Sequence, residues 1–462
     1  MNLRNVLRSS LLALACALTA ITAAAQYTDT QAIQDLGGAK AFEARRAELA
    51  KQCKTGWILL FARNEIPEAT HYREDNDFYY YTGLQDPGAA MAIESATGKT
   101  YIFETQQDPR TAQVYGPNLW SLPADQRAAM GYPVVLSITT LDSFLSAQTR
   151  FGSDTPSSDI WVRLNFPDKA DGARPEVGRD NGWKFSHPYH EPIPANLANN
   201  VLLQQRYPEL HFHDLTPFMD AMRNVKRPEE IEVERRIGKI SAEANKDAIA
   251  HAKPGMFQYQ IEALAYYEMF DKGAQGASYP AIVSSGNDVN VIHYFADRHQ
   301  IAANDLVVFD FAGSLDHLTM DITRTFNISG KFTPEQAKWY AVDLEAQKAT
   351  LAMLSAGHTY EEASDAGKAV FEKGGIGDQW HGFPGHFVGL ATHDVGATKG
   401  PVKAGQVVTV EPYIDFPDKH MHFRVEDTVL ITDGAPENLS AAIPKEMADV
   451  EALVGSAVTG KK

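Results

Sequence analysis

Residues 306–311 and 321–325 read LVVFDF and DITRT, and these two stretches decide the fold of the C-terminal half. The first is hydrophobic enough to be a central strand and ends in Asp310, whereas Asp321 opens a second strand. An intervening hairpin would bring the two aspartates together. A carboxylate buried at such a point requires a cation or several hydrogen-bond donors, so the pair indicates a polar site inside the core.

The pattern of a buried strand that ends in an acid recurs twice downstream. Residues 407–412, VVTVEP, contain Glu411, and residues 422–427, HFRVED, contain Glu426. His386, in the stretch GHFVGL, adds one nitrogen donor. Singly, such acids pair more often with arginine or backbone groups, and a lone core histidine is usually hydrogen bonded. Together, oxygen-rich ligation with one imidazole predicts two divalent ions, with Mn²⁺ preferred over Co²⁺, Fe²⁺ or Zn²⁺.

The N-terminus has the features of an export signal over residues 1–25. Positive charge precedes an apolar stretch at 11–21, and small residues follow before Gln26. We therefore expect a periplasmic or secreted protein. Cys53 is the one cysteine left after cleavage, so no intrachain disulfide is expected.

Composition narrows the function classes. The chain has 462 residues, which is too long for one hydrophobic core, so two or three domains are expected. Its net charge is −17, and no cluster of lysine and arginine is visible. Nucleic acid and anionic membranes are therefore not expected partners, and no later stretch is apolar enough to cross a bilayer.

The N-terminal unit, residues 26–221, has the alternating strand and helix signals of an α/β domain. A proline-rich segment at 186–195 is predicted to be a surface loop. Strands are expected at 56–62, 78–82, 89–93, 100–103 and 211–215, and helices at 123–130, 141–148 and 196–207.

The C-terminal unit, residues 222–462, changes character at Lys226–Ile231, where a proline followed by acids begins a long helix. Its strands and helices come in segregated pairs, which favours an α+β domain with antiparallel sheets. Helices are expected from about 228 to 252 and at 258–270, 334–354 and 360–372, with strands at 281–284, 306–311, 319–326, 407–411 and 422–431.

The order Asp, Asp, His, Glu, Glu with these flanking strings resembles the pita-bread metallopeptidases, which include methionine aminopeptidase, prolidase, aminopeptidase P and creatinase. The similarity spans roughly residues 222–440. It implies a pita-bread catalytic domain that binds two divalent metal ions. The metal ligands it implies are Asp310, Asp321, His386, Glu411 and Glu426.

The N-terminal unit narrows the resemblance to the aminopeptidase P and prolidase group. Residues 77–83, DFYYYTG, resemble the aminopeptidase P N-terminal domain, as do Arg45-Arg46 and Tyr72-Arg73. Three residues further match the proline-specific members of the family. They are His293, His393 and Arg424.

The resemblance implies that a metal-bridging hydroxide hydrolyses the bond before proline at the N-terminus of a peptide. Glu411 would receive the proton and pass it to the departing proline nitrogen. His293 and His393 would hydrogen bond the carbonyl oxygen, and Arg424 would orient the pocket or bind a peptide carboxyl or carbonyl group. Relatives also imply a possible homo-oligomer formed through the N-terminal domain.

Three alternatives stay open. A prolidase would be restricted to Xaa-Pro dipeptides by a more closed cleft. A creatinase-like hydrolase or a pita-bread peptide-binding protein would work without metal, although such proteins lose ligand carboxylates that this chain keeps. The chain also departs from the family where Tyr413-Ile414-Asp415 follows Glu411, and His317 and His420 are expected to be exposed.

Overall fold

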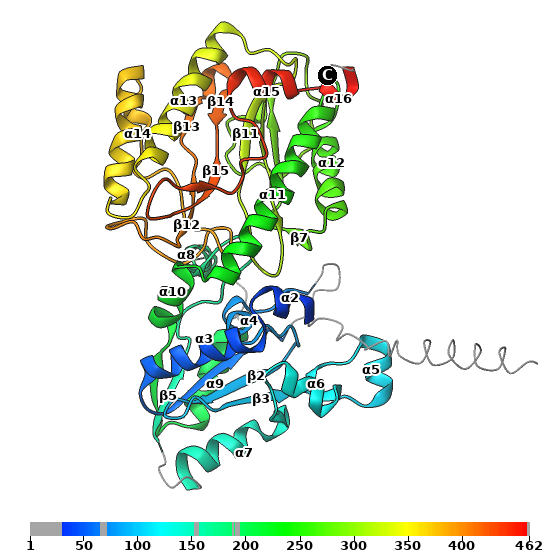
Figure 1. Ribbon diagram of the computed structural model, residues 1–462, viewed down its shortest axis with the longest axis vertical. Helices are drawn as coiled ribbons and strands as arrows, with labels where there is room; N and C mark the ends of the chain where they lie inside the picture. Colours follow the sequence, from blue (N-terminus) through cyan, green and yellow to red (C-terminus); the bar gives the residue numbers. More distant parts are fainter. Residues whose placement is uncertain (1–29, 65–71, 152–156, 187–188, 190–194, 460–462) are drawn as a thin grey trace, which may run out of the picture.

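The computed structural model describes residues 30–64, 72–151, 157–186, 189 and 195–459. Two lobes follow one another along the chain, and the last helix of the first lobe leads into the second (Figure 1). The expected signal segment 1–25 lies outside the described residues, as does most of the expected loop at 186–195. Within the described part of the chain, no helix combines the length and apolarity needed to span a membrane.

A six-stranded mixed sheet forms the centre of the N-terminal domain, in the order β4-β3-β2-β1-β5-β6. β1 pairs antiparallel with β2 and β2 with β3, whereas the outer pairs are parallel. Four of the five expected strands are confirmed, and β4 and β5 were not predicted. The strands are β1 (Trp57–Phe61), β2 (Ala90–Glu94), β3 (Thr100–Glu104), β4 (Val135–Ser137), β5 (Asp159–Val162) and β6 (His211–Asp214).

Helices pack around this sheet and continue toward the second domain (Figure 1). The three expected helices correspond to α6, α7 and α9. α10 crosses the predicted domain boundary at residues 221–222 and contacts α3. The helices are α2 (Thr30–Asp35), α3 (Gly38–Cys53), α4 (Asn76–Thr82), α5 (Pro109–Tyr115), α6 (Ala124–Ala129), α7 (Leu141–Ser146), α8 (Arg174–Phe185), α9 (Ala195–Arg206) and α10 (Thr216–Asn224).

The strand predicted at 78–82 is wrong, because these residues belong to helix α4. Asp75 caps the helix by accepting hydrogen bonds from the backbone N–H groups of Asp77 and Phe78. Gly83 ends it in the left-handed conformation, with φ 66°. The aromatic run is buried on every side, so tertiary packing overrides the strand preference of its residues.

The C-terminal domain contains several small antiparallel sheets, as expected for an α+β unit. The three-stranded sheets run in the orders β11-β9-β8 and β12-β15-β16, and β13 pairs with β14 and β7 with β10. The strands are β7 (Gly276–Ala277), β8 (Ile282–Ser285), β9 (Leu306–Asp310), β10 (Gly313–Ser314), β11 (Thr323–Asn327), β12 (Val407–Val410), β13 (Tyr413–Phe416), β14 (Met421–Arg424), β15 (Asp427–Leu430) and β16 (Glu437–Asn438).

Two helix pairs, α11 with α12 and α13 with α14, pack on these sheets, and all four helices were predicted. α13 begins with a capping box in which Thr333 and Gln336 exchange hydrogen bonds. The helices are α11 (Pro228–His251), α12 (Gln258–Asp271), α13 (Pro334–Ala352), α14 (Tyr360–Gly374), α15 (Met447–Leu453) and α16 (Ser456–Thr459).

The single strand predicted at 422–431 is wrong, because the chain breaks between β14 and β15 and the two halves join different sheets. The backbone N–H of Glu426 donates to the carbonyl oxygen of Thr323 in β11. This bond separates the end of β14, which pairs with β13, from the start of β15, which pairs with β12. The break therefore directs Glu426 toward the β11-β9-β8 sheet.

His317 was expected to be exposed and is buried instead. Its ring stacks on Tyr79 with centroids 3.7 Å apart, and Nε2 lies 3.0 Å from Gln85 Oε1. The hairpin between β10 and β11 points its tip into the domain junction, which sequence periodicity does not reveal. His420 is exposed, as expected.

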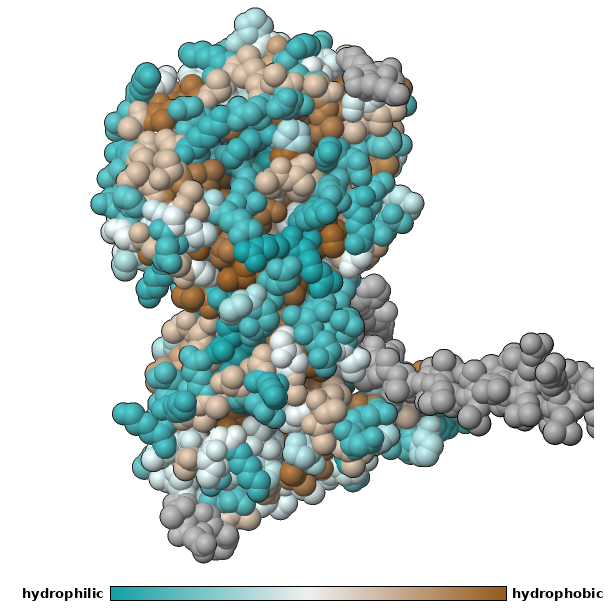
Figure 2. Space-filling model, in the orientation of Figure 1, coloured by the Kyte–Doolittle hydropathy of each residue, from teal (hydrophilic) through white to brown (hydrophobic). Residues whose placement is uncertain are grey.

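The domain junction is narrower than either lobe (Figure 2) and contains buried ion pairs. Asp77 accepts hydrogen bonds from Arg163, Arg174 and Arg223 at 2.6, 2.8 and 2.9 Å. Buried charges of this kind are stable only when each is paired, and Arg223 extends the network to the second domain through its ion pair with Asp394.

Candidate active site

Asp310 and Asp321 are brought together by the pairing of β9 with β11. Thr323 lies opposite Asp310 in this ladder, which places Asp321 just beyond it. Both aspartates are only 6% exposed. The backbone of Asp321 exchanges hydrogen bonds with Thr428 Oγ1, which fixes it against the neighbouring sheet. The hairpin expected from the sequence therefore exists and buries both carboxylates.

Glu411 and Glu426 follow from the pairing of β12 with β15. Val410 lies opposite Asp427, so the two glutamates lie beside each other at the end of this ladder. Thr323 Oγ1 donates to Glu426 Oε2 at 2.6 Å, which links the glutamate pair to the sheet that carries the aspartates. The four carboxylates thus converge from two sheets.

His386 lies between these pairs. Nε2 is 3.4 Å from Asp321 Oδ2 and 3.1 Å from Glu411 Oε1, while Nδ1 donates to the carbonyl oxygen of Phe387 at 3.1 Å. The backbone bond assigns the Nδ1 proton and presents Nε2 to the carboxylates. Burial lowers the pKa of His386, but its hydrogen bonds with Asp321 and Glu411 outweigh burial and hold that pKa well above the ordinary value.

These residues fit a divalent cation. Donor atoms of Asp310, Asp321 and Glu426 lie within 4.8 Å of one another, as do those of His386, Glu411 and Glu426. Asp321 Oδ1 and Glu426 Oε1 are buried and accept no hydrogen bond. Burial raises the pKa of Glu426, and the neighbouring carboxylates raise it further. A cation would stabilise these crowded oxygens, which are the ligands that divalent metals of this kind prefer.

Arg424 and Tyr279 hold Asp310 from outside the cluster. Arg424 Nη2 donates to Asp310 Oδ2, and Arg424 Nε donates to Thr323 Oγ1 at 3.2 Å. The Tyr279 hydroxyl donates to Asp310 Oδ1 at 2.5 Å. Arg424 is 3% exposed. Of its two expected roles, these contacts favour orientation of the site over binding of a peptide carboxyl group.

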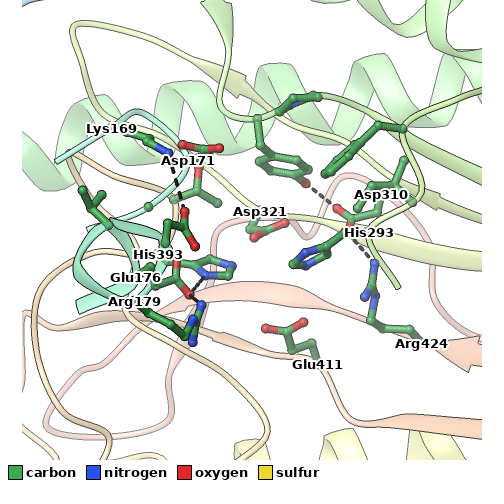
Figure 3. A pocket seen from close by; sticks show the side chains of 18 residues that line it. Lys169, Asp171, Glu176, Arg179, His293, Asp310, Asp321, His393, Glu411 and Arg424 are labelled. Atoms are coloured by element: carbon green, nitrogen blue, oxygen red, sulfur yellow. Dashed lines mark hydrogen bonds and ion pairs between the residues drawn. The ribbon is translucent and has the colours of Figure 1, made fainter. Parts of the chain in front are cut away.

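A cavity of about 220 Å³ opens onto the cluster, and all four residues expected to act on substrate line it alongside Asp310 and Asp321 (Figure 3). His293 lies on the turn before β9, and its ring is exposed to the cavity. The ring of His393 lies with its centroid 3.9 Å from that of His386. Glu411 and Arg424 also line this cavity, and His386 and Glu426 lie in the adjoining donor cluster, so the structure brings all the predicted site residues together.

The N-terminal domain supplies one wall of the cavity, and sequence reasoning missed this wall. Its residues include Lys169, Glu176 and Arg179 (Figure 3). Glu176 Oε1 is 2.7 Å from His393 Nδ1. Tyr279 was also missed. No local signal could have found these residues, because their role depends on a contact between distant parts of the chain.

Comparison with known proteins identifies the family of each domain. Residues 232–433 match metallopeptidase family M24, and residues 42–154 match the aminopeptidase P N-terminal domain. The C-terminal domain belongs to metallopeptidase family M24. As an M24 enzyme the protein is a hydrolase, and its two domains are those of the aminopeptidase P type, as the sequence predicted.

Similar proteins extend over nearly the whole chain. The Xaa-Pro aminopeptidases of Escherichia coli and Haemophilus influenzae are each 27% identical, over 90% and 89% of this chain and 98% and 96% of their own lengths. The solved aminopeptidase PepP of Pseudomonas aeruginosa is 26% identical, and aminopeptidase P of E. coli with the inhibitor Pro-Leu is 25% identical. Each superposes with a TM-score of 0.74 over 91% of this chain and 99% of the other.

Proposed function

We propose that the chain is an exported aminopeptidase that releases the first residue from peptides with proline in second position. The observation that carries the proposal is the single cavity that joins Asp310, Asp321 and Glu411 to His293 and His393. Its support is the set of similar proteins named Xaa-Pro aminopeptidase, which match at both domains.

We further propose that the centre holds two divalent ions, with Mn²⁺ the first choice. Among the described residues, three donor trios overlap; two of them share Glu426 and together contain all five predicted ligands, which supports a pair of ions over a single one, and the third joins His393 to Asp321 and His386. Asp310, Asp321, His386, Glu411 and Glu426 would hold them. When bound, such ions lower the pKa of water and polarise a carbonyl oxygen.

The protein's own groups then have separate tasks. Glu411 Oε1 lies at the edge of the cavity and accepts from Thr409 Oγ1 at 3.1 Å, which leaves Oε2 to receive a proton and return it to the departing proline nitrogen. His293 and His393 face the cavity, where an N–H group would stabilise charge on the carbonyl oxygen. Arg424 orients Asp310 and opposes the rise in its pKa that burial causes.

The cavity also has an apolar side suited to a proline ring. Its lining includes Tyr279, Pro280, Ile282 and Phe295. The bond before proline is a tertiary amide, which general peptidases accommodate poorly. A rigid apolar wall would favour this bent substrate over an ordinary peptide.

Peptide length separates the aminopeptidase from a prolidase. The purified protein, loaded with Mn²⁺, is assayed on an Xaa-Pro dipeptide and on a longer peptide with the same first two residues. We expect turnover of the longer peptide, and an alanine-for-proline version of that peptide serves as the control. Turnover of the dipeptide alone would establish the prolidase instead.

Metal content separates either enzyme from a peptide-binding protein. We expect about two transition-metal ions per chain after Mn²⁺ loading and removal of the excess, since a preformed set of carboxylates binds tightly. Fewer than about one ion per chain, together with peptide binding but no cleavage, would favour the binding protein.

Export rests on the sequence of residues 1–25 alone. Expression in a Gram-negative host, followed by fractionation and N-terminal sequencing, should give a periplasmic or secreted protein that begins near Gln26. Recovery of the intact N-terminus in the cytoplasm would contradict it. The expected homo-oligomer is tested on the same material by light scattering.

A further inference from the structure

Glu176 contacts His393 across the domain junction. It lies in the first turn of α8, in the N-terminal domain, and its Oε1 is 2.7 Å from His393 Nδ1 (Figure 3). The two side chains are 30% and 31% exposed, and both line the cavity. Among the described residues, no other carboxylate lies within hydrogen-bond distance of this ring.

The hydrogen bond fixes which ring nitrogen carries a proton. An ionised carboxylate can only accept, so Nδ1 of His393 must donate. Burial raises the pKa of Glu176, but the bond with His393 outweighs this and keeps the pKa below its ordinary value. Nε2 is then the nitrogen that is available to a molecule in the cavity.

The backbone around His393 is held by the same segment of the N-terminal domain. His393 N donates to the carbonyl oxygen of Asp171 at 3.2 Å, and its carbonyl oxygen accepts from Ala173 N at 2.8 Å. One residue earlier, Thr392 N donates to the carbonyl oxygen of Ala170 at 2.9 Å. Both the ring and the backbone of His393 are therefore positioned by residues 170–176.

This segment is itself anchored. Arg174, two residues before Glu176, is 1% exposed and donates to Asp168 at 2.9 Å and to Asp77 at 2.8 Å. α8 therefore starts from a fixed point in the buried ionic network. A support of this rigidity can hold a side chain within the narrow range that catalysis requires.

We propose that Glu176 is a positioning residue, which holds His393 with Nε2 toward the substrate carbonyl, so that the N-terminal domain completes the active site. This inference rests on the proposed function. It extends that function by giving the N-terminal domain a part in the chemistry. Catalysis in the C-terminal domain would then depend on a side chain that lies 217 positions before His393 in the sequence.

Two substitutions test the proposal in the full-length, Mn²⁺-loaded protein. Glu176→Ala should lower kcat about 10–100-fold with little change in KM, because the ring loses its orientation while substrate contacts remain. Glu176→Gln should recover much of this loss, since its amide oxygen still accepts from Nδ1. A fall in kcat of less than about 3-fold for Glu176→Ala would overturn the proposal.

A double substitution separates positioning from a general loss of stability. In a His393→Ala background, Glu176→Ala should cause no further fall in kcat, because its effect passes through the ring. If the fold losses in kcat of the two single variants multiply in the double variant, the proposal is overturned. The control is Glu48→Ala, which removes an ion pair with Arg227 that also joins the two domains but lies outside the cavity. An equal loss in this control would show that domain tethering alone matters, and would also overturn it.

A spectroscopic readout keeps the test independent of activity. The histidines are labelled with ¹⁵N, and the His393 signals are assigned by their loss in His393→Ala. The wild type should show a protonated Nδ1 at His393, and Glu176→Ala should change the distribution of the proton between the two ring nitrogens. An identical His393 spectrum in both would overturn the proposal. If the wild type cleaves no Xaa-Pro peptide, the proposed function fails, and this spectrum still decides whether Glu176 sets the ring.

Discussion

Arg223 of α10 and Asp394, which follows His393, form a buried ion pair 2.5 Å long across the domain junction. Arg223 also donates to Asp168 at 2.6 Å and to Asp77 at 2.9 Å, and Lys226 adds a second cation 3.3 Å from Asp394. The residue next to a cavity histidine is thus tied to the middle of the N-terminal domain. Stability of the junction and geometry of the site share these contacts.

Replacing Arg223 with methionine should therefore destabilise the protein. The change leaves Asp77, Asp168 and Asp394 buried with too few partners, which costs about 3–5 kcal/mol when one member of a buried pair is removed. Urea unfolding, followed by fluorescence, measures the loss. Arg235→Met, which breaks an exposed pair with Glu437, should cost at most about 1 kcal/mol. Equal midpoints for the two variants would contradict the buried network.

Glu411→Gln should abolish hydrolysis without unfolding the protein. The amide cannot take up the proton that the carboxylate is expected to transfer, so we expect a fall in kcat of about 100-fold or more. Asp310→Ala should lower kcat as strongly and also reduce the metal content. Steady-state kinetics, elemental analysis and circular dichroism measure these effects. Near-normal turnover in either variant would refute the site assignment.

Removal of divalent metal should abolish activity and lower thermal stability together. Crowded carboxylates repel one another without a cation, and a ligand present at about 100 times its Kd raises the free energy of unfolding by about 2.7 kcal/mol. Treatment with EDTA, followed by titration with Mn²⁺ in a thermal melt, measures this. Asp310→Ala should show a smaller rise in Tm. A wild-type Tm that Mn²⁺ leaves unchanged would argue against the metal centre.

Asp297, which follows the cavity residues His293 and Phe295 in the sequence, should make the stability of the protein depend on pH. Burial raises its pKa to about 7, so the folded state retains a proton that the unfolded state has lost. The wild type therefore loses stability as pH rises from about 4 to about 7, and Asp297→Asn lacks this contribution. The Tm of Asp297→Asn minus that of the wild type should increase across this range. A constant difference would show that Asp297 does not titrate there, and Asp271→Asn, at an exposed position, serves as the matched control.

The catalytic domain could be predicted from sequence because its strands carry their own signals. Each candidate ligand follows or interrupts a short run of apolar residues, so Asp310 and Glu411 stood out as acids in a core. The strand predicted for the aromatic run at 78–82 was wrong because its local signal was misleading. Its residue types favour a strand, but capping by Asp75 and burial on all sides made it a helix.

The sequence by itself determined the domain types, the family and the identity of the five clustered donors, because order and local hydrophobic pattern are written along the chain. Tertiary structure alone decided that β14 and β15 separate to aim Glu426, that His317 is buried, and that Glu176 reaches His393. These contacts join residues far apart in sequence. Their energies depend on a closed, water-poor junction that forms only when both domains have folded, and no local pattern encodes it.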